Sequence, residues 1–166
     1  MKGRYSTNGD VDAAIAAMRS ASSELQERLK EDSSPEQRVA IWQGLRRCGG
    51  VHAGMGFFVV AKSIHRVADD AIVAAMDHEP LKGIGLRLDA IKKRYGLADE
   101  EEWPLGEAPP ECEALLAEWD RAADQVIADT FRRFGEHEMA DLFLGDRAEF
   151  DRRYEEGRRV LFGQKE

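Results

Sequence analysis

The sequence has little of what marks several large classes of protein. It contains only two cysteines, Cys48 and Cys112, in 166 residues, which is too few for a disulfide framework. Such a cysteine content suits a reducing compartment, so we expect a cytoplasmic protein. The longest uncharged apolar run, residues 51–61, is shorter than the ~20 residues that a membrane-spanning helix needs. No apolar stretch follows the basic residues near the N-terminus, so we expect no signal peptide and no membrane contact.

Positive charge is in the minority. The chain has 24 basic and 32 acidic side chains, which gives a net charge of −8. This balance keeps a protein soluble and disfavours general attraction to nucleic acid, so we expect no nucleic-acid partner. The content of 43% apolar and 34% charged residues suits a folded globular protein and argues against disorder.

Sustained alternation of apolar and polar residues, the mark of a β-strand, is also absent. Only the aromatic and β-branched run at residues 57–60 could form a strand, and the segments on both sides of it have helical spacing. We therefore predict an all-α protein, with a flexible N-terminal tail at residues 1–9. Residues 10–166 are predicted to form a single-domain helical bundle of five to seven helices.

The bundle is predicted to surround one long central helix at about residues 51–77. Its first half is apolar on every side, as in a helix that is enclosed on all sides. From Lys62 onward a polar stripe appears, so the second half is expected to be half-exposed. At about 1.5 Å per residue, this helix is roughly 40 Å long. The residues predicted to lie in the core are Phe58, Val60, Ile64, Val67 and Ile72.

Capping and turn residues mark the other helices. Asp10 can cap a first helix, and residues 34–37 (SPEQ) form a capping box for a second. A fourth helix runs from Leu81 to Gly96. The long connection at residues 97–110 is expected to be held to the core by Trp103 and Leu105. A fifth helix follows from Pro110, then a short segment ending at Gly145, and residues 146–149 (DRAE) resemble a capping box for a last helix.

Two histidines have an aspartate four residues later on the same helix face. The pairs are His65 with Asp69 and His137 with Asp141, and together they would offer two imidazoles and two carboxylates to a divalent metal. The Glu-x-x-His and His-x-x-x-His patterns of helical metal sites are absent, and each pair also suits a helix surface. We therefore expect no bound metal and no cofactor.

An arginine precedes a histidine by five residues at two places. These pairs are Arg47 with His52 and Arg132 with His137, a spacing similar to the R-x(4–6)-H motif of HEPN-family ribonucleases, which are small helical bundles. The resemblance implies acid–base work for the histidine and charge stabilisation by the arginine. It covers six residues at each place, and both pairs span glycines that we assign to helix ends. We therefore do not assign the chain to this family.

Two glycines interrupt the apolar half of the central helix. Gly54 and Gly56 each cost about 1 kcal/mol relative to alanine within a helix. Close approach of another helix, or of a second subunit, at Met55 and Phe57 would explain them. An apolar patch that is left uncovered there would favour a twofold homodimer, so these four residues are the predicted interface.

The sequence shows no established catalytic motif. It lacks a phosphate-binding loop, a nucleophile elbow and a Ser/His/Asp arrangement. The function predicted first is therefore that of a helical bundle acting through contacts with a protein partner or with itself. The alternative is a small histidine-dependent hydrolase, such as a HEPN-like ribonuclease, or a metal-binding bundle based on histidine and aspartate.

Overall fold

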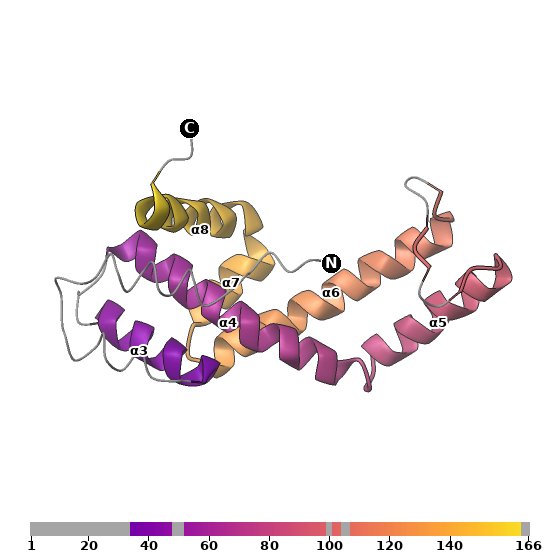
Figure 1. Ribbon diagram of the computed structural model, residues 1–166, viewed down its shortest axis with the longest axis horizontal. Helices are drawn as coiled ribbons and strands as arrows, with labels where there is room; N and C mark the ends of the chain where they lie inside the picture. The colour runs from indigo at the N-terminus through magenta and orange to yellow at the C-terminus, as the bar shows by residue number, and fades with distance from the viewer. Residues whose placement is uncertain (1–33, 48–51, 99–100, 104–106, 164–166) are drawn as a thin grey trace.

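The computed structural model describes residues 34–47, 52–98, 101–103 and 107–163. As predicted, the described residues are all-helical, with six helices and no strand. No described helix combines the length and the apolar character that crossing a membrane requires. The tail expected at residues 1–9 and the helix expected from Asp10 lie outside the described residues. In chain order the helices are α3 (Pro35–Arg47), α4 (Ala53–Ala75), α5 (Leu81–Arg94), α6 (Pro110–Arg133), α7 (His137–Gly145) and α8 (Arg147–Phe162) (Figure 1).

Local sequence signals set the helix ends. At the start of α3, the backbone N–H of Gln37 donates to Ser34 Oγ (3.2 Å) and the backbone N–H of Ser34 donates to Gln37 Oε1 (2.8 Å). This is the predicted capping box. At the start of α8, Asp146 Oδ1 accepts a hydrogen bond from the backbone N–H of Glu149 (3.1 Å). Gly135 follows α6 with a φ of 77°, a conformation that glycine adopts without a steric penalty.

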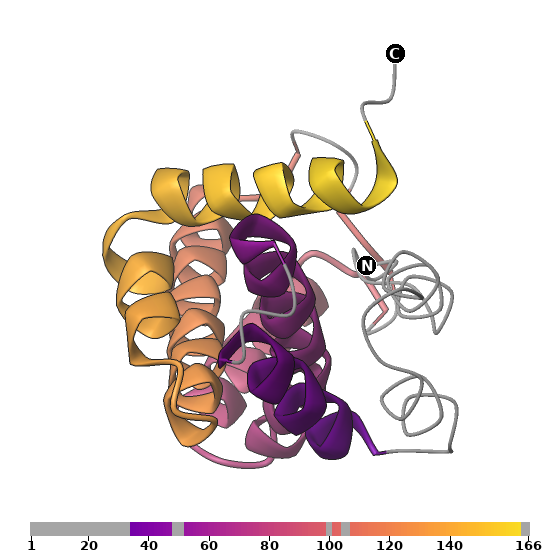
Figure 2. The same ribbon diagram turned by 90° about the vertical axis from the view of Figure 1, so that its left-hand side faces the viewer.

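Helix α4 is the centre of the fold. Residues 55–61 are all buried, and α3, α6 and α8 pack against this helix. Figure 2 shows α8 crossing over the beginning of α4. Four of the five predicted core residues are buried: Phe58, Val60, Ile64 and Val67. The prediction for Ile72 is corrected, because this residue is only half-buried. It lies toward the end of α4, which extends past α3 and α8 and past the place where α6 crosses it (Figure 1).

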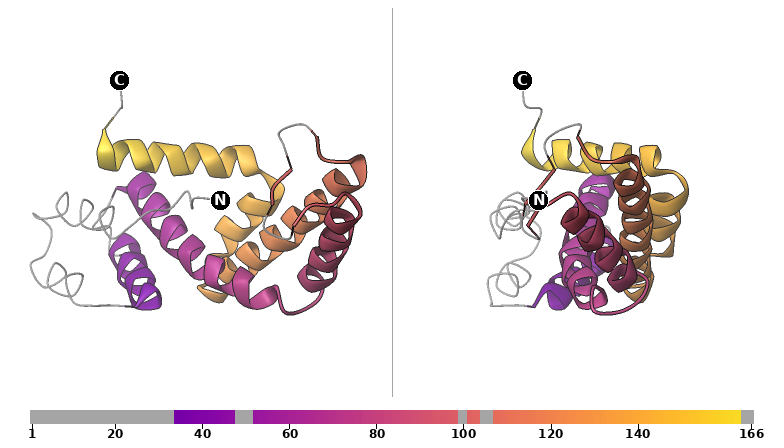
Figure 3. Two further views of the ribbon diagram at one scale, coloured as in Figure 1. Left: turned by 45° about the vertical axis from the view of Figure 1, so that its right-hand side comes forward. Right: turned by 90° about the vertical axis from the view of Figure 1, so that its right-hand side faces the viewer.

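Helix α5 and the first half of α6, residues 110–122, form an extension that we call the arm. The two helices contact each other and project away from α3 and α8 (Figures 1 and 3). Trp103 packs against the core of the arm, as expected for the long connection, whereas Leu105 lies outside the described residues. This small core is separate from the main one and consists of Ile84, Ile91, Cys112 and Leu115.

Candidate functional site

The imidazole of His65 lies among phenylalanine rings. Helix α4 places this side chain inside the main core with only 4% of its surface exposed. The rings of Phe131, Phe143 and Phe150, from α6, α7 and α8, have centroids 5.3, 5.5 and 6.1 Å from the imidazole centroid. Burial disfavours the charged imidazole, and the nearby Arg147 guanidinium repels it, so the pKa of His65 falls to about 4. At neutral pH, His65 is therefore an uncharged member of the aromatic core.

The environments of His65 and Asp69 differ sharply, although the two residues are one turn apart. The Asp69 carboxylate is exposed while the imidazole faces the phenylalanine rings. Partial burial, followed by repulsion from Asp70, raises the pKa of Asp69. Among the residues that the structure describes, no group of three or more His, Cys, Asp or Glu side chains is placed to hold a metal ion.

His137 and Asp141 are both exposed on the short helix α7. His137 is the first residue of this helix. The guanidinium of Arg132 lies between two carboxylates, 3.1 Å from Asp129 Oδ1 and 3.6 Å from Asp141 Oδ1. These ion pairs thus join Arg132 to Asp141 and to Asp129, and neither of them includes His137.

Arg47 and His52 lie on either side of residues 48–51, which are outside the described part of the chain. Arg47 Nε donates to the carbonyl oxygen of Gln43 (3.2 Å), one turn earlier in α3. His52 is the N-cap residue of α4, and its Nδ1 accepts a hydrogen bond from the backbone N–H of Gly54 (3.2 Å). Each side chain thus contacts the end of its own helix, a local role that explains its position without a substrate.

The residues predicted as a dimer interface are covered within one chain. Met55, Gly56 and Phe57 are buried, and Gly54 is half-buried. The cover is α8, which approaches α4 so closely that a Cβ added at Gly157 would overlap the Gly54 carbonyl oxygen. Close approach of a neighbouring helix, one of the two explanations offered for these glycines, is thus what the structure shows.

A nearly buried carboxylate joins two parts of the fold. Glu136, in the turn between α6 and α7, is 8% exposed. Its Oε1 accepts hydrogen bonds from Gln43 Nε2 (3.0 Å) and from the guanidinium of Arg46, both on α3. Because these partners are about 90 residues away in sequence, no local pattern predicts the contact. Its geometry ties α3 to the α6–α7 turn.

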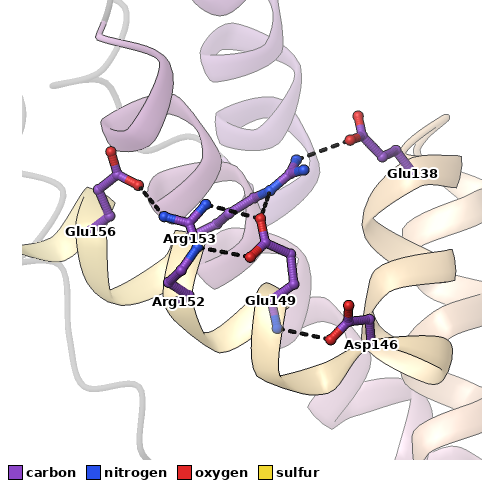
Figure 4. A network of polar contacts seen from close by, with 6 residues as sticks. All are labelled: Glu138, Asp146, Glu149, Arg152, Arg153 and Glu156. Atoms are coloured by element: carbon purple, nitrogen blue, oxygen red, sulfur yellow. Dashed lines mark hydrogen bonds and ion pairs between the residues drawn. The ribbon is translucent and has the colours of Figure 1, made fainter.

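The outer surface of α8 carries a network of ion pairs (Figure 4). The Glu149 carboxylate accepts hydrogen bonds from Arg152 (2.7 Å) and Arg153 (2.9 Å), which lower its pKa to about 2. Arg153 also reaches Glu138 of α7 (2.9 Å). The spacings of three and four residues within α8 are those at which oppositely charged side chains meet on a helix, so the sequence carries the signal for them. Exposed pairs of this kind fix surface geometry and contribute little stability.

Beside this network, α8 borders a shallow depression of about 440 Å³. Its lining within the described residues consists of Arg152, Glu156, Arg159 and Val160, without a histidine or a cysteine. The candidate catalytic residues do not line it.

Two large apolar side chains are exposed where α4 and α5 leave the main core. Val73 is 65% exposed and Leu86 is 60% exposed, the two highest values among large hydrophobic residues in the described part of the chain. The sequence contains a signal for both. Val73 interrupts the polar stripe of the central helix, and Leu86 lies two residues after the buried Ile84, about 200° around the helix. The sequence analysis did not identify Val73 and Leu86 as exposed apolar residues.

The described geometry thus places the candidate histidines in the core or at helix ends, and leaves exposed apolar side chains on α4 and α5. Comparison of the chain with protein-family models, with curated proteins and with solved structures gives no match.

Proposed function

We propose that this protein functions by binding another protein. The observation that carries the proposal is the exposure of Val73 and Leu86, described above. Full burial of a valine or leucine side chain against a partner is worth about 1.5–3 kcal/mol. A partner that covers both residues would therefore gain several kcal/mol from these two side chains alone.

The neighbours of these two residues enlarge the apolar surface. Met76, 46% exposed, lies three residues after Val73, and the exposed Ala90 lies four residues after Leu86. Residues three and four apart are neighbours on a helix surface, so each exposed side chain belongs to a small apolar group. Single exposed apolar residues are common on proteins, whereas grouped ones mark contact surfaces.

The positions of the histidines favour this function over hydrolysis. A histidine acting as acid or base needs a polar partner and room for a substrate. His65 is enclosed by phenylalanine rings, and the Nδ1 of His52 accepts a backbone hydrogen bond. Near the exposed His137, the guanidinium of Arg132 is engaged with two aspartates.

The test is affinity purification from extracts of the source cells, with captured proteins quantified by mass spectrometry. The variant Val73→Ser/Leu86→Ser removes both apolar centres, and Leu144→Ser changes an exposed leucine on α7 as a matched control. We expect the wild type and the control to capture the same partner and the double variant to lose it.

Two results would overturn the proposal. One is an identical set of captured proteins for all three forms. The other is cleavage of RNA by the purified wild type that disappears in both Arg132→Ala and His137→Ala, because such a result would support a HEPN-like ribonuclease.

A further inference from the structure

The exposed end of α4 has an apolar centre surrounded by carboxylates. Asp69 and Asp70 precede Val73 by four and three residues, and Met76 and Asp77 follow it by three and four. We call these five exposed residues the acidic face. In the part of the chain that the structure describes, none of the three carboxylates forms an ion pair. No ion pair with a described residue therefore neutralises the acidic face, and the nearest basic side chain on the same stripe is the half-buried Arg66, four residues before Asp70.

The outer side of α5 has the opposite charge around a similar apolar centre. Lys82 precedes Leu86 by four residues, and Ala90 and Lys93 follow it by four and seven, so all four lie along one stripe of the helix. We call these four exposed residues the basic face. Neither lysine forms an ion pair with any described residue. Asp89, which is half-buried, is the only acidic residue of α5.

The two faces lie on consecutive helices, and the basic face points away from α6. On α5 the residues buried against the arm's core include Ile84 and Ile91, which are opposite Leu86 around the helix. On α4, Val73 lies about 180° from the buried Ile64. Since α6 packs against α5, the basic face is on the side of α5 that α6 leaves open, and the residues of the acidic face are exposed at the end of α4.

We infer that the partner is a second copy of this chain, with the acidic face of each copy packed on the basic face of the other. A twofold axis between the copies produces this arrangement. The acidic face of the first copy contacts the basic face of the second, and the acidic face of the second contacts the basic face of the first. Val73 and Met76 of one copy meet Leu86 and Ala90 of the other at the centre, and lysines meet aspartates around them. The pairing rests on the proposed function and specifies its partner.

The charges of the two faces support a second copy of the chain as the partner. Of the five basic residues of α5, Arg87 and Arg94 pair with Glu118 and Glu111 of α6, whereas Lys82 and Lys93 form no ion pair with a described residue. An acidic helix would complement these two lysines. The acidic face offers such a helix, with an apolar centre of the same kind. Moreover, the carboxylates of Asp69 and Asp70 repel each other, and the lysines of a second copy would relieve this repulsion.

The twofold arrangement allows a test by complementary charge reversal. The variant Lys82→Glu/Lys93→Glu makes the basic face acidic, and the variant Asp70→Lys/Asp77→Lys makes the acidic face basic. Each variant alone would place like charges opposite each other at both contacts. An equimolar mixture would form a heterodimer in which one contact joins two unaltered faces and the other joins two reversed faces, so both again pair opposite charges.

Sedimentation equilibrium measures the outcome. We expect the wild type to approach twice the monomer mass of 18.6 kDa. Each variant alone should associate at least about tenfold more weakly, and the mixture should return to near the wild-type affinity. The control Leu144→Ser should behave as the wild type, and circular dichroism checks that every variant retains its helices and its thermal transition.

A wild type that stays at 18.6 kDa at every concentration overturns the inference, and so does a dimer that is indifferent to both charge reversals or a mixture that stays monomeric. These failures are distinct from failure of the proposed function. A monomeric wild type that still captures another protein through Val73 and Leu86 refutes only self-association.

Discussion

Replacing Gly157 with alanine tests how closely α8 packs on α4. A Cβ at this position would lie 2.6 Å from Phe58 Cβ and 2.7 Å from the carbonyl carbon of Gly54, and it would overlap the Gly54 carbonyl oxygen. The groups it meets are backbone and Cβ atoms, which cannot rotate away as the end of a flexible side chain can. The two helices would have to separate, and the rings of Phe58 and Tyr154, whose centroids are 4.7 Å apart, would lose contact.

The expected size follows from two opposing effects. Overpacking in a well-packed core costs about 1–3 kcal/mol, and this overlap belongs at the upper end of that range. Alanine gains about 1 kcal/mol over glycine in a helix interior. We therefore expect Gly157→Ala to lower the free energy of unfolding by about 2 kcal/mol. For a chain of this size, that loss lowers Tm by roughly 4–8 °C.

Urea denaturation and thermal unfolding, both followed by circular dichroism at neutral pH, measure this change. Two variants serve as controls. Gly44→Ala places its Cβ where no atom lies within 4 Å, so it should stabilise the protein by about 0.5–1 kcal/mol. Gly54→Ala meets only ordinary contacts, at 3.4 Å from His52 Nδ1 and 3.6 Å from Gly157 Cα, so it should stabilise the protein by up to about 1 kcal/mol. A Gly157→Ala variant at least as stable as the wild type would refute the described packing of α8 on α4.

Three further predictions concern the core. Because the pKa of His65 is about 4 when folded and 6.5 for an unperturbed histidine, the unfolded chain binds the proton first as the pH falls. The neutral His65 side chain therefore contributes at most about 3 kcal/mol to the free energy of unfolding; this contribution is fully present above pH 6.5 and is lost as the pH falls toward 4. Urea titrations across this range should show that the free energy of unfolding of His65→Phe depends less on pH than that of the wild type. Glu136→Ala should cost about 1.5–3 kcal/mol through its bonds to α3, whereas Glu149→Ala, which removes exposed pairs, should change the free energy of unfolding much less. Phe58→Ala should cost about 3–5 kcal/mol in the same assay, and a change below about 1 kcal/mol would contradict its burial.

Local chemistry explains why much of the fold could be predicted. The hydrogen bonds of Ser34 with Gln37 and the cap at Asp146 depend on residues within one turn, so their spacing in the sequence is sufficient. Likewise, an uncharged stretch must be enclosed, and residues 55–61 of α4 are. The burial of Ile72 was predicted wrongly because its helical period continues beyond the part of α4 that α3, α6 and α8 cover.

The candidate site depends on distant residues, and here prediction was weaker. His65 is enclosed by rings that lie 66, 78 and 85 residues later in the chain, so the i,i+4 spacing with Asp69 says nothing about its surroundings. The glycine at position 54 correctly indicated a close approach, but only the three-dimensional structure identifies Gly157 as the neighbour. By contrast, the exposure of Val73 follows from its place among aspartates on the polar stripe of α4. The sequence alone therefore contained enough information to predict it.

The packing of α8 over α4 has a consequence for synthesis on the ribosome. Phe57 and Phe58 leave the ribosome about 90 residues before Phe150 and Tyr154, the rings that cover them. At about 5–20 residues per second, the apolar half of α4 waits roughly 5–20 seconds for its cover. During that interval the apolar side chains of residues 55–61 lack the cover that α8 provides in the folded protein. Folding yield in the cell should therefore respond to translation speed between these two segments more than to speed elsewhere in the message.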